Sequence, residues 1–156
     1  MIIVDMQIAS EHSELPNQEQ LTAWAQAALQ GLKDEAELSI RLVDEAESQQ
    51  LNLEYRGQDK PTNVLSFPFE VPEALQGLDE VGQLIGDLVI CAQVVADEAT
   101  LQHKPAIHHW AHMVVHGCLH LLGYDHITDA EAQVMEDMER TILGSLNIAD
   151  PYLTIE

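Results

Sequence analysis

The sequence predicts an α+β or mixed-sheet domain built from four strands and five helices. Short stretches in which apolar and polar residues alternate are typical of half-buried strands. Longer stretches carry apolar residues at helical spacing between residues that cap helices. The chain has 156 residues, of which 46% are hydrophobic, and this fits one domain with a substantial core. We therefore expect residues 1–156 to form a single domain.

The first half of the chain is expected to alternate strands with helices. The clearest strand is 37–43, where every second residue is apolar. Gly31 follows an apolar helical stripe and is expected to end that helix, and Asp44 with Glu47 resembles a capping box that opens the next one. The expected elements are a strand at 2–8, a helix from 17 to about 30, a strand at 37–43 and a helix from 44 to 53 or 55.

The second half is expected to contain two strands and then three helices. Pro68 indicates an edge position or a strand end, Gly86 with Asp87 interrupts the following strand, and the acidic stretch 70–82 is expected to be a mobile loop. The expected elements are a loop at 56–61, strands at 63–69 and 84–91, and helices at 93–103, from 105 to about 122, and from 129 to about 143, the last with Thr128 and Glu131 as a capping box.

The strongest functional signal lies in 116–126, His-Gly-Cys-Leu-His-Leu-Leu-Gly-Tyr-Asp-His. On a helix, His116 and His120 lie one turn apart on the same face. Gly123 can take a left-handed backbone, end the helix and turn the chain so that His126 meets the other two. Three imidazoles arranged in this way form an open zinc site, with one position left for water or substrate.

The other histidines fit a single metal less well. His108, His112, His116 and His120 recur every four residues, and each step overshoots a full turn by roughly 40°, so one metal cannot bind all four. His112 lies one turn before His116 and is favoured as a core or surface residue, although it remains a candidate neighbour of the site.

The histidine spacing is also that of metzincin metalloproteases. In those enzymes a Glu directly after the first His is the general base, and this position is Gly117 here. A protease is therefore the weaker interpretation.

Four charged residues besides the histidines are further candidates. Asp125 precedes the third His and could orient an imidazole or shape the turn. Asp87 lies in a strand that looks buried, where a carboxylate needs a partner, so a role beside the site or substrate is expected. Arg56 and Lys60 stand in one short segment and are two of only six cations in the chain; an Arg can grip a phosphate through two hydrogen bonds. Three aromatic side chains could stack nucleobases: Tyr55, Phe67 and Tyr124.

The charge balance restricts the possible partners. There are 27 acidic and six basic residues, a net charge of −21, and this argues against binding to nucleic acids or anionic membranes through general electrostatics. Binding of RNA then requires that the few cations gather at the site, or that basic partner proteins dock the enzyme. The N-terminus has no basic signal region and no apolar run is long enough for a membrane span, so we expect a cytoplasmic protein.

Three segments resemble one known family. Residues 116–126 resemble the signature of the YbeY endoribonucleases, which are bacterial rRNA maturation factors, and 55–68 and 84–90 are similar to its second and third blocks. The resemblance implies a mixed four-stranded sheet flanked by helices, and one zinc bound by His116, His120 and His126, with a functional arginine at Arg56. It also implies hydrolytic, single-strand-specific RNA cleavage in small-subunit rRNA 3′-end maturation and ribosome quality control. The implied partners are rRNA, the small ribosomal subunit with its proteins, and the GTPase Era.

The expected function is therefore that of a metal-dependent hydrolase domain in which Arg56 and His116, with a metal-bound water, are catalytic. A metal at three imidazoles lowers the pKa of bound water toward about 7, and Arg56 would stabilise charge on the phosphodiester. The general base stays open between metal hydroxide, Asp87, Asp125 and His112, as does attack by water or by the RNA 2′-hydroxyl. Nickel or another divalent ion could replace zinc.

Two other functions stay open besides the protease. A structural zinc would need a fourth protein ligand, supplied by Asp125 or Cys118. A non-catalytic, metal-stabilised adaptor in ribosome assembly would need the metal only for its fold.

Overall fold

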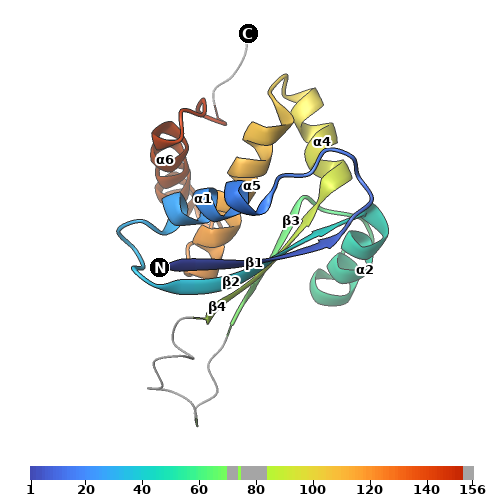
Figure 1. Cartoon of the computed structure of the whole chain (residues 1–156), viewed down its shortest axis with the longest axis horizontal. Helices are drawn as coiled ribbons and strands as arrows, with labels where there is room; N and C mark the ends of the chain where they lie inside the picture. Colours follow the sequence, from blue (N-terminus) through green and yellow to red (C-terminus); the bar gives the residue numbers. More distant parts are fainter. Residues whose placement is uncertain (70–73, 75–83, 153–156) are drawn as a thin grey trace.

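The computed structural model describes residues 1–69, 74 and 84–152. In this part of the chain every strand and helix expected from the sequence is present, with ends within two residues of the prediction (Figure 1). The expected loop at 70–82 lies outside the described residues apart from residue 74. The elements are β1 (Ile2–Ala9), α1 (Gln18–Leu29), β2 (Ala36–Val43), α2 (Glu45–Arg56), β3 (Val64–Pro68), β4 (Leu84–Cys91), α4 (Ala92–Leu101), α5 (Ala106–Leu121) and α6 (Asp129–Ser145).

The four strands form one mixed sheet in the order β1-β2-β4-β3. β1, β2 and β4 run parallel, whereas β3 pairs antiparallel with β4 and forms an edge. Pro68 ends this edge strand, where its missing N–H costs no ladder hydrogen bond. The predicted α+β class with a mixed four-stranded sheet is therefore confirmed.

The helices cover the two faces of the sheet unequally. Figure 1 shows α1, α5 and α6 on one side of the sheet and α2 on the other. The inward face of the central strands packs against α5 in the main core, whereas a smaller cluster lies on the α2 side. Fully buried residues on the α5 side include Leu38, Ile40, Leu88 and Ile90, and the smaller cluster contains Val43, Leu65, Val89 and Cys91.

Two glycines allow close approach between α5, β4 and β3. A Cβ on Gly117 would lie 2.7 Å from Leu88 Cδ2, so α5 passes closer to the sheet than a side chain at 117 permits. Gly86 has φ +143°, and a Cβ there would lie 2.3 Å from the backbone oxygen of Phe67. These contacts place the histidine-bearing helix beside the edge strand β3. The interruption expected at Gly86 is a bulge, because the pairing with β2 skips Ile85.

The local signals for helix ends were correct in position but not always in chemistry. Gly31 takes the left-handed conformation just after α1, with φ +79°, and the Thr128 side chain accepts a hydrogen bond from the Glu131 N–H. The predicted capping box at Asp44 is wrong: its carboxylate accepts from Ser10, Gln93 and the Glu11 N–H. Glu47 pairs with Arg41 instead. Hydrogen bonds from residues in distant parts of the chain therefore take the place of the expected helix cap.

None of the described helices has the length and apolar character needed to cross a membrane.

Candidate metal centre and cleft

Three histidines meet at the C-terminal end of α5. His116 and His120 lie on the helix, which ends at Leu121. Gly123 has φ +99°; its N–H donates to the His120 carbonyl at 3.0 Å, and the Tyr124 N–H donates to the Leu119 carbonyl at 3.1 Å. This pattern is a Schellman motif, and it returns the chain so that the ring of His126 lies 5.7 Å from that of His116 and 5.2 Å from that of His120.

The donor atoms of this cluster fit a small divalent transition metal. One ligand atom from each of His116, His120 and His126 lies within 4.8 Å of the others, and the Nε2 atoms of His116 and His120 are 3.1 Å apart. Nitrogen ligands of a tetrahedral zinc, each at about 2.0–2.1 Å from the ion, lie about 3.3 Å apart. Burial lowers the pKa of His120, and the neighbouring His116 lowers it further. The neutral imidazole, which is the metal-binding form, is therefore favoured.

A buried carboxylate supports the cluster from behind. Glu139 on α6 is 0% exposed. Its Oε1 accepts hydrogen bonds from His116 Nδ1 at 2.7 Å and His112 Nε2 at 3.1 Å, and its Oε2 accepts one from the Tyr152 hydroxyl at 2.5 Å. Burial raises the pKa of Glu139, but these hydrogen bonds outweigh it and lower the pKa to about 2. Glu139 is thus a carboxylate buried without a Lys or Arg partner among the described residues.

This carboxylate fixes the tautomer of His116. An ionised carboxylate can only accept hydrogen bonds, so His116 carries its proton on Nδ1 and leaves the Nε2 lone pair facing the cluster. Burial lowers the pKa of His112, although its bond to Glu139 opposes this. His112, His116 and Glu139 form a second group whose ligand atoms are close enough to hold a metal. Because two N–H donors already bind Glu139, we interpret this group as the support of His116.

Glu139 was not among the site residues predicted from the sequence, although the sequence carries a signal for it. Met135, Glu139 and Leu143 are spaced by four and form the buried stripe of α6. A carboxylate in the middle of an apolar helical stripe requires hydrogen-bond partners in the core. Here the partners are His112 and His116 on the neighbouring helix α5.

The histidines open into a cleft of about 660 Å³ between the end of α5 and the edge strand β3. Its opposite wall includes Arg56, the last residue of α2, after which Gly57 turns the chain with φ +72°. The following loop is held to α2 by Ser48, which bonds the Thr62 backbone at 3.0 Å, and by Asn52, which donates to the Lys60 carbonyl at 2.8 Å. These bonds fix the position from which Arg56 reaches the cleft.

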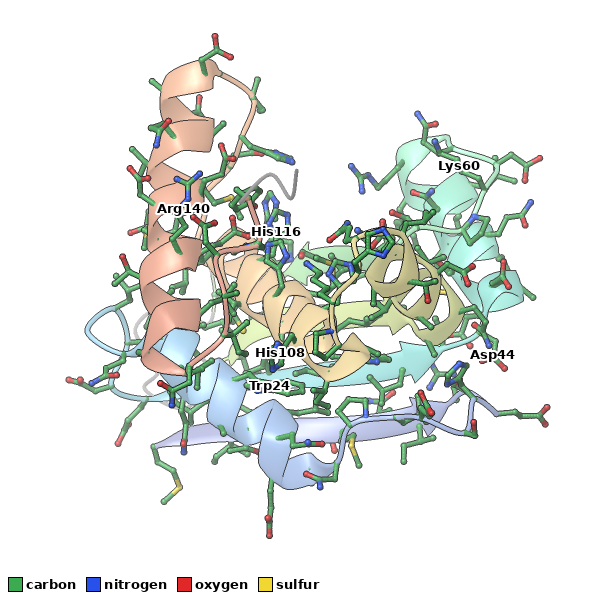
Figure 2. The ribbon with its side chains drawn as sticks, turned by 90° about the horizontal axis from the view of Figure 1, so that it is seen from above. Trp24, Asp44, Lys60, His108, His116 and Arg140 are labelled. Atoms are coloured by element: carbon green, nitrogen blue, oxygen red, sulfur yellow. The ribbon has the colours of Figure 1, made fainter. Side chains whose placement is uncertain are left out.

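Among the described residues the guanidinium of Arg56 has no partner, in contrast to those of the other two arginines. Arg41 pairs with Glu47, and Arg140 pairs with Asp137 and Asp150. Arg56 makes no ion pair or hydrogen bond with any residue that the structure describes. Lys60 is exposed but does not line the cleft. Figure 2 shows His116 between α6 and the end of α2, beyond which Lys60 lies.

The remaining candidates divide between the two faces of the sheet. Asp125 lines the cleft, and its Oδ1 accepts from the His126 N–H at 2.8 Å. Asp87 is not buried beside the histidines as expected, because Leu88 faces α5 and the neighbouring Asp87 points to the opposite face. There it is exposed and accepts a hydrogen bond from Ser39 at 2.5 Å. The alternative role of Asp87 toward substrate stays a prediction. Of the aromatic candidates, Tyr55 and Phe67 line the cleft, whereas Tyr124 packs against the core.

Comparison with protein families matches residues 5–147 to the family described as Endoribonuclease YbeY. The chain belongs to this family. YbeY proteins are metal-dependent endoribonucleases, so this protein is a hydrolase that acts on RNA, and the family's process is rRNA maturation. The solution structure of TM1509 from Thermotoga maritima is similar over 94% of this chain and 92% of that chain, with 24% identity and a TM-score of 0.59. This likeness shows a shared fold.

This chain differs from a metzincin protease at position 117 for a physical reason. Gly117 faces Leu88 in the core rather than the cleft, and even a Cβ would lie 2.7 Å from that side chain. A Glu at this position has no space and would bury a charge. The helix that carries the histidines is therefore packed so that it cannot present the protease base.

Proposed function

We propose that residues 1–156 form a single zinc-dependent hydrolase domain that cleaves single-stranded RNA. His116, His120 and His126 bind the metal, and Arg56 and His116 act at the catalytic centre. The observation that carries this proposal is the shared cleft of about 660 Å³. Three convergent imidazoles line it on one side, and Arg56, which has no ion-pair partner among the described residues, lines it on the other. A bound zinc supplies Lewis acidity toward a phosphoryl oxygen and lowers the pKa of a water ligand.

The protein's own residues would divide the remaining work. Arg56 donates hydrogen bonds to the non-bridging oxygens of the scissile phosphodiester. Glu139 holds His116 in the metal-binding tautomer. Of the three side chains considered as general base, Asp87 lies on the other face of the sheet and His112 is buried behind Glu139. Asp125 is the one that lines the cleft.

We further propose that the substrate is the 3′ end of small-subunit rRNA, and that the enzyme acts in ribosome quality control in the cytoplasm. The net charge of −21 supports docking through basic proteins of the small subunit, because opposite charges steer association. The resemblance of the sequence motifs supports the GTPase Era as a further partner.

Removal of the metal tests this function. We expect the purified protein to carry about one zinc per chain and to cleave a single-stranded oligoribonucleotide, but not the same sequence in a duplex. Chelation should abolish cleavage, and added zinc should restore it, with nickel compared in parallel. Metal content by mass spectrometry and cleavage on a gel are the measurements. Cleavage that persists in metal-free protein would reveal a contaminant, and full metal without cleavage would favour a ribosome-assembly adaptor.

Glu139→Gln should weaken metal binding without removing a ligand. The amide keeps the size of the side chain but loses the charge that orients His116, and loss of such support typically costs about 10–100-fold in metal affinity. Competition with a chelator measures the affinity. Glu136→Gln, a matched change on the same helix, should leave it unchanged. If Glu139→Gln unfolds, Tyr152→Phe removes only one hydrogen bond to the carboxylate; equal zinc affinity in all folded variants would contradict a supporting role.

A further inference from the structure

A second hollow lies behind the edge strand, on the face of the sheet that α2 covers. Its volume is about 480 Å³. Tyr55 and Phe67 line both this hollow and the histidine cleft, so the two are continuous across one pair of side chains. Figure 1 shows α2 on the side of the sheet opposite α5, which carries the histidines. An extended RNA strand that leaves the cleft over β3 therefore reaches this hollow.

An aromatic ridge separates the two spaces. The rings of Tyr55 and Phe67 pack edge to face with centroids 5.1 Å apart, and Tyr55 is 62% exposed. The hydroxyl of Tyr55 makes no hydrogen bond within the described residues. Flat, exposed aromatic surfaces of this kind bind single-stranded nucleic acids by stacking on their bases.

The floor of the hollow is apolar, and its polar wall accepts hydrogen bonds. Leu51 and Val89 line it beside the ridge. Asp87 pairs in register with Phe67 on β3 and with Ser39 on β2, and its Oδ1 accepts from the Ser39 hydroxyl. The Oδ2 of Asp87 has no hydrogen-bond partner among the described residues. Because the Ser39 proton is already given to Asp87, both groups present only acceptors to a ligand.

The cation that lines this hollow, Arg41, is already neutralised. Arg41 donates to both carboxylate oxygens of Glu47, at 2.6 and 3.1 Å, and to Gln7 at 3.2 Å. The hollow therefore repels phosphate, whereas the cleft on the other side of the ridge contains Arg56, whose charge no described residue neutralises. The two spaces together suit one nucleotide: its phosphate in the cleft and an uncharged base in the hollow.

We propose that the hollow is a nucleobase subsite of the RNA-cleaving site, and that Asp87 selects bases with N–H donors. Guanine fits best, because its N1–H and N2–H donors are adjacent and can meet a carboxylate together. Cytosine and adenine offer one amino group each. Uracil offers one N–H between two carbonyls and is disfavoured. This subsite rests on the proposed RNA cleavage, and it gives Asp87 a role in substrate selection away from the metal.

A set of uridine decamers, each with one guanosine at a different position, tests the subsite. Binding of fluorescein-labelled decamers to the zinc-loaded enzyme is read by anisotropy before cleavage proceeds, and cleavage positions are read on a gel. A good two-bond base contact is worth about tenfold or more. We therefore expect the best guanosine decamer to bind about tenfold more tightly than the all-uridine decamer, and the cut to follow the guanosine at a constant offset.

Asp87→Asn should abolish both effects, and binding of the all-uridine decamer should not weaken, because the substitution removes the charge that disfavours uracil. The amide can still accept the Ser39 hydrogen bond, so the fold is expected to persist, which a thermal melt checks. Asp5→Asn is the matched control, because it removes the same charge from the neighbouring strand. Asp5 on β1 is in register with Ser39 on β2, as Asp87 on β4 is. Tyr55→Ala should weaken all decamers about tenfold through lost stacking.

The outcomes separate the subsite from the cleavage itself. Equal affinity for all decamers, or a guanosine preference that survives in Asp87→Asn, would overturn the subsite. Guanosine-dependent binding that Asp87→Asn removes, in an enzyme that cuts no decamer, would support the subsite and reject the proposed nuclease. Asp87-dependent binding of a labelled pentalysine peptide without any guanosine preference would overturn the proposal in favour of a basic protein segment.

Discussion

His120→Ala is expected to lose bound metal and RNA cleavage together. The substitution removes one of three convergent nitrogen ligands, so the remaining pair no longer encloses the ion. The affinity should fall by more than the roughly 10–100-fold that loss of a supporting hydrogen bond costs. Alanine is the best helix former, so α5 should persist. Metal content after gel filtration and the initial rate of single-strand cleavage are measured on the same preparation.

His108→Ala is the control for this prediction. His108 lies on the same four-residue stripe of α5 but at its opposite end, as Figure 2 shows relative to His116, and it does not line the histidine cleft. It should keep both metal and activity. A His120→Ala protein with wild-type zinc content would show that the metal binds elsewhere, and the group of His112, His116 and Glu139 would be the next candidate.

The parts of the site that follow from local sequence were predictable. His116, His120 and the turn at Gly123 depend on helical spacing and on one residue that tolerates a left-handed backbone. The structure brings these side chains and His126 together as the spacing indicates. The strands and helices were also predictable, because their apolar patterns reflect which face each element buries.

The parts that depend on packing between distant elements were not predictable. Asp87 looked buried because its neighbours are apolar, yet a strand alternates between two faces and only one of them is covered at that position. Glu139 interrupts the apolar stripe of α6, but nothing local in the sequence identifies the histidines of α5 as its hydrogen-bond partners. The capping function expected of Asp44 was displaced by Ser10 and Gln93, which are 34 and 49 residues away along the chain.

Arg56→Ala is expected to keep the metal and lose cleavage. The guanidinium lines the cleft opposite the three histidines and makes no ion pair with the described residues, so its removal leaves no buried partner uncompensated. Loss of one preorganised donor to a developing charge typically costs about 10²–10³-fold in kcat. Zinc content and thermal stability should match the wild type, because the side chain is exposed at the end of α2.

Two further variants decide what Arg56 does. Arg56→Lys keeps the positive charge but cannot donate two parallel hydrogen bonds to a phosphate, so it should recover only part of the rate. Lys60→Ala removes an equal charge from the adjacent loop, outside the cleft, and should change cleavage at low salt only slightly. If Lys60→Ala were as inactive as Arg56→Ala, general attraction of RNA would explain both losses. Full activity in Arg56→Lys would show that charge alone is sufficient, whereas a large gap between Lys and Arg would mean that Arg56 grips the scissile phosphate through its paired donors.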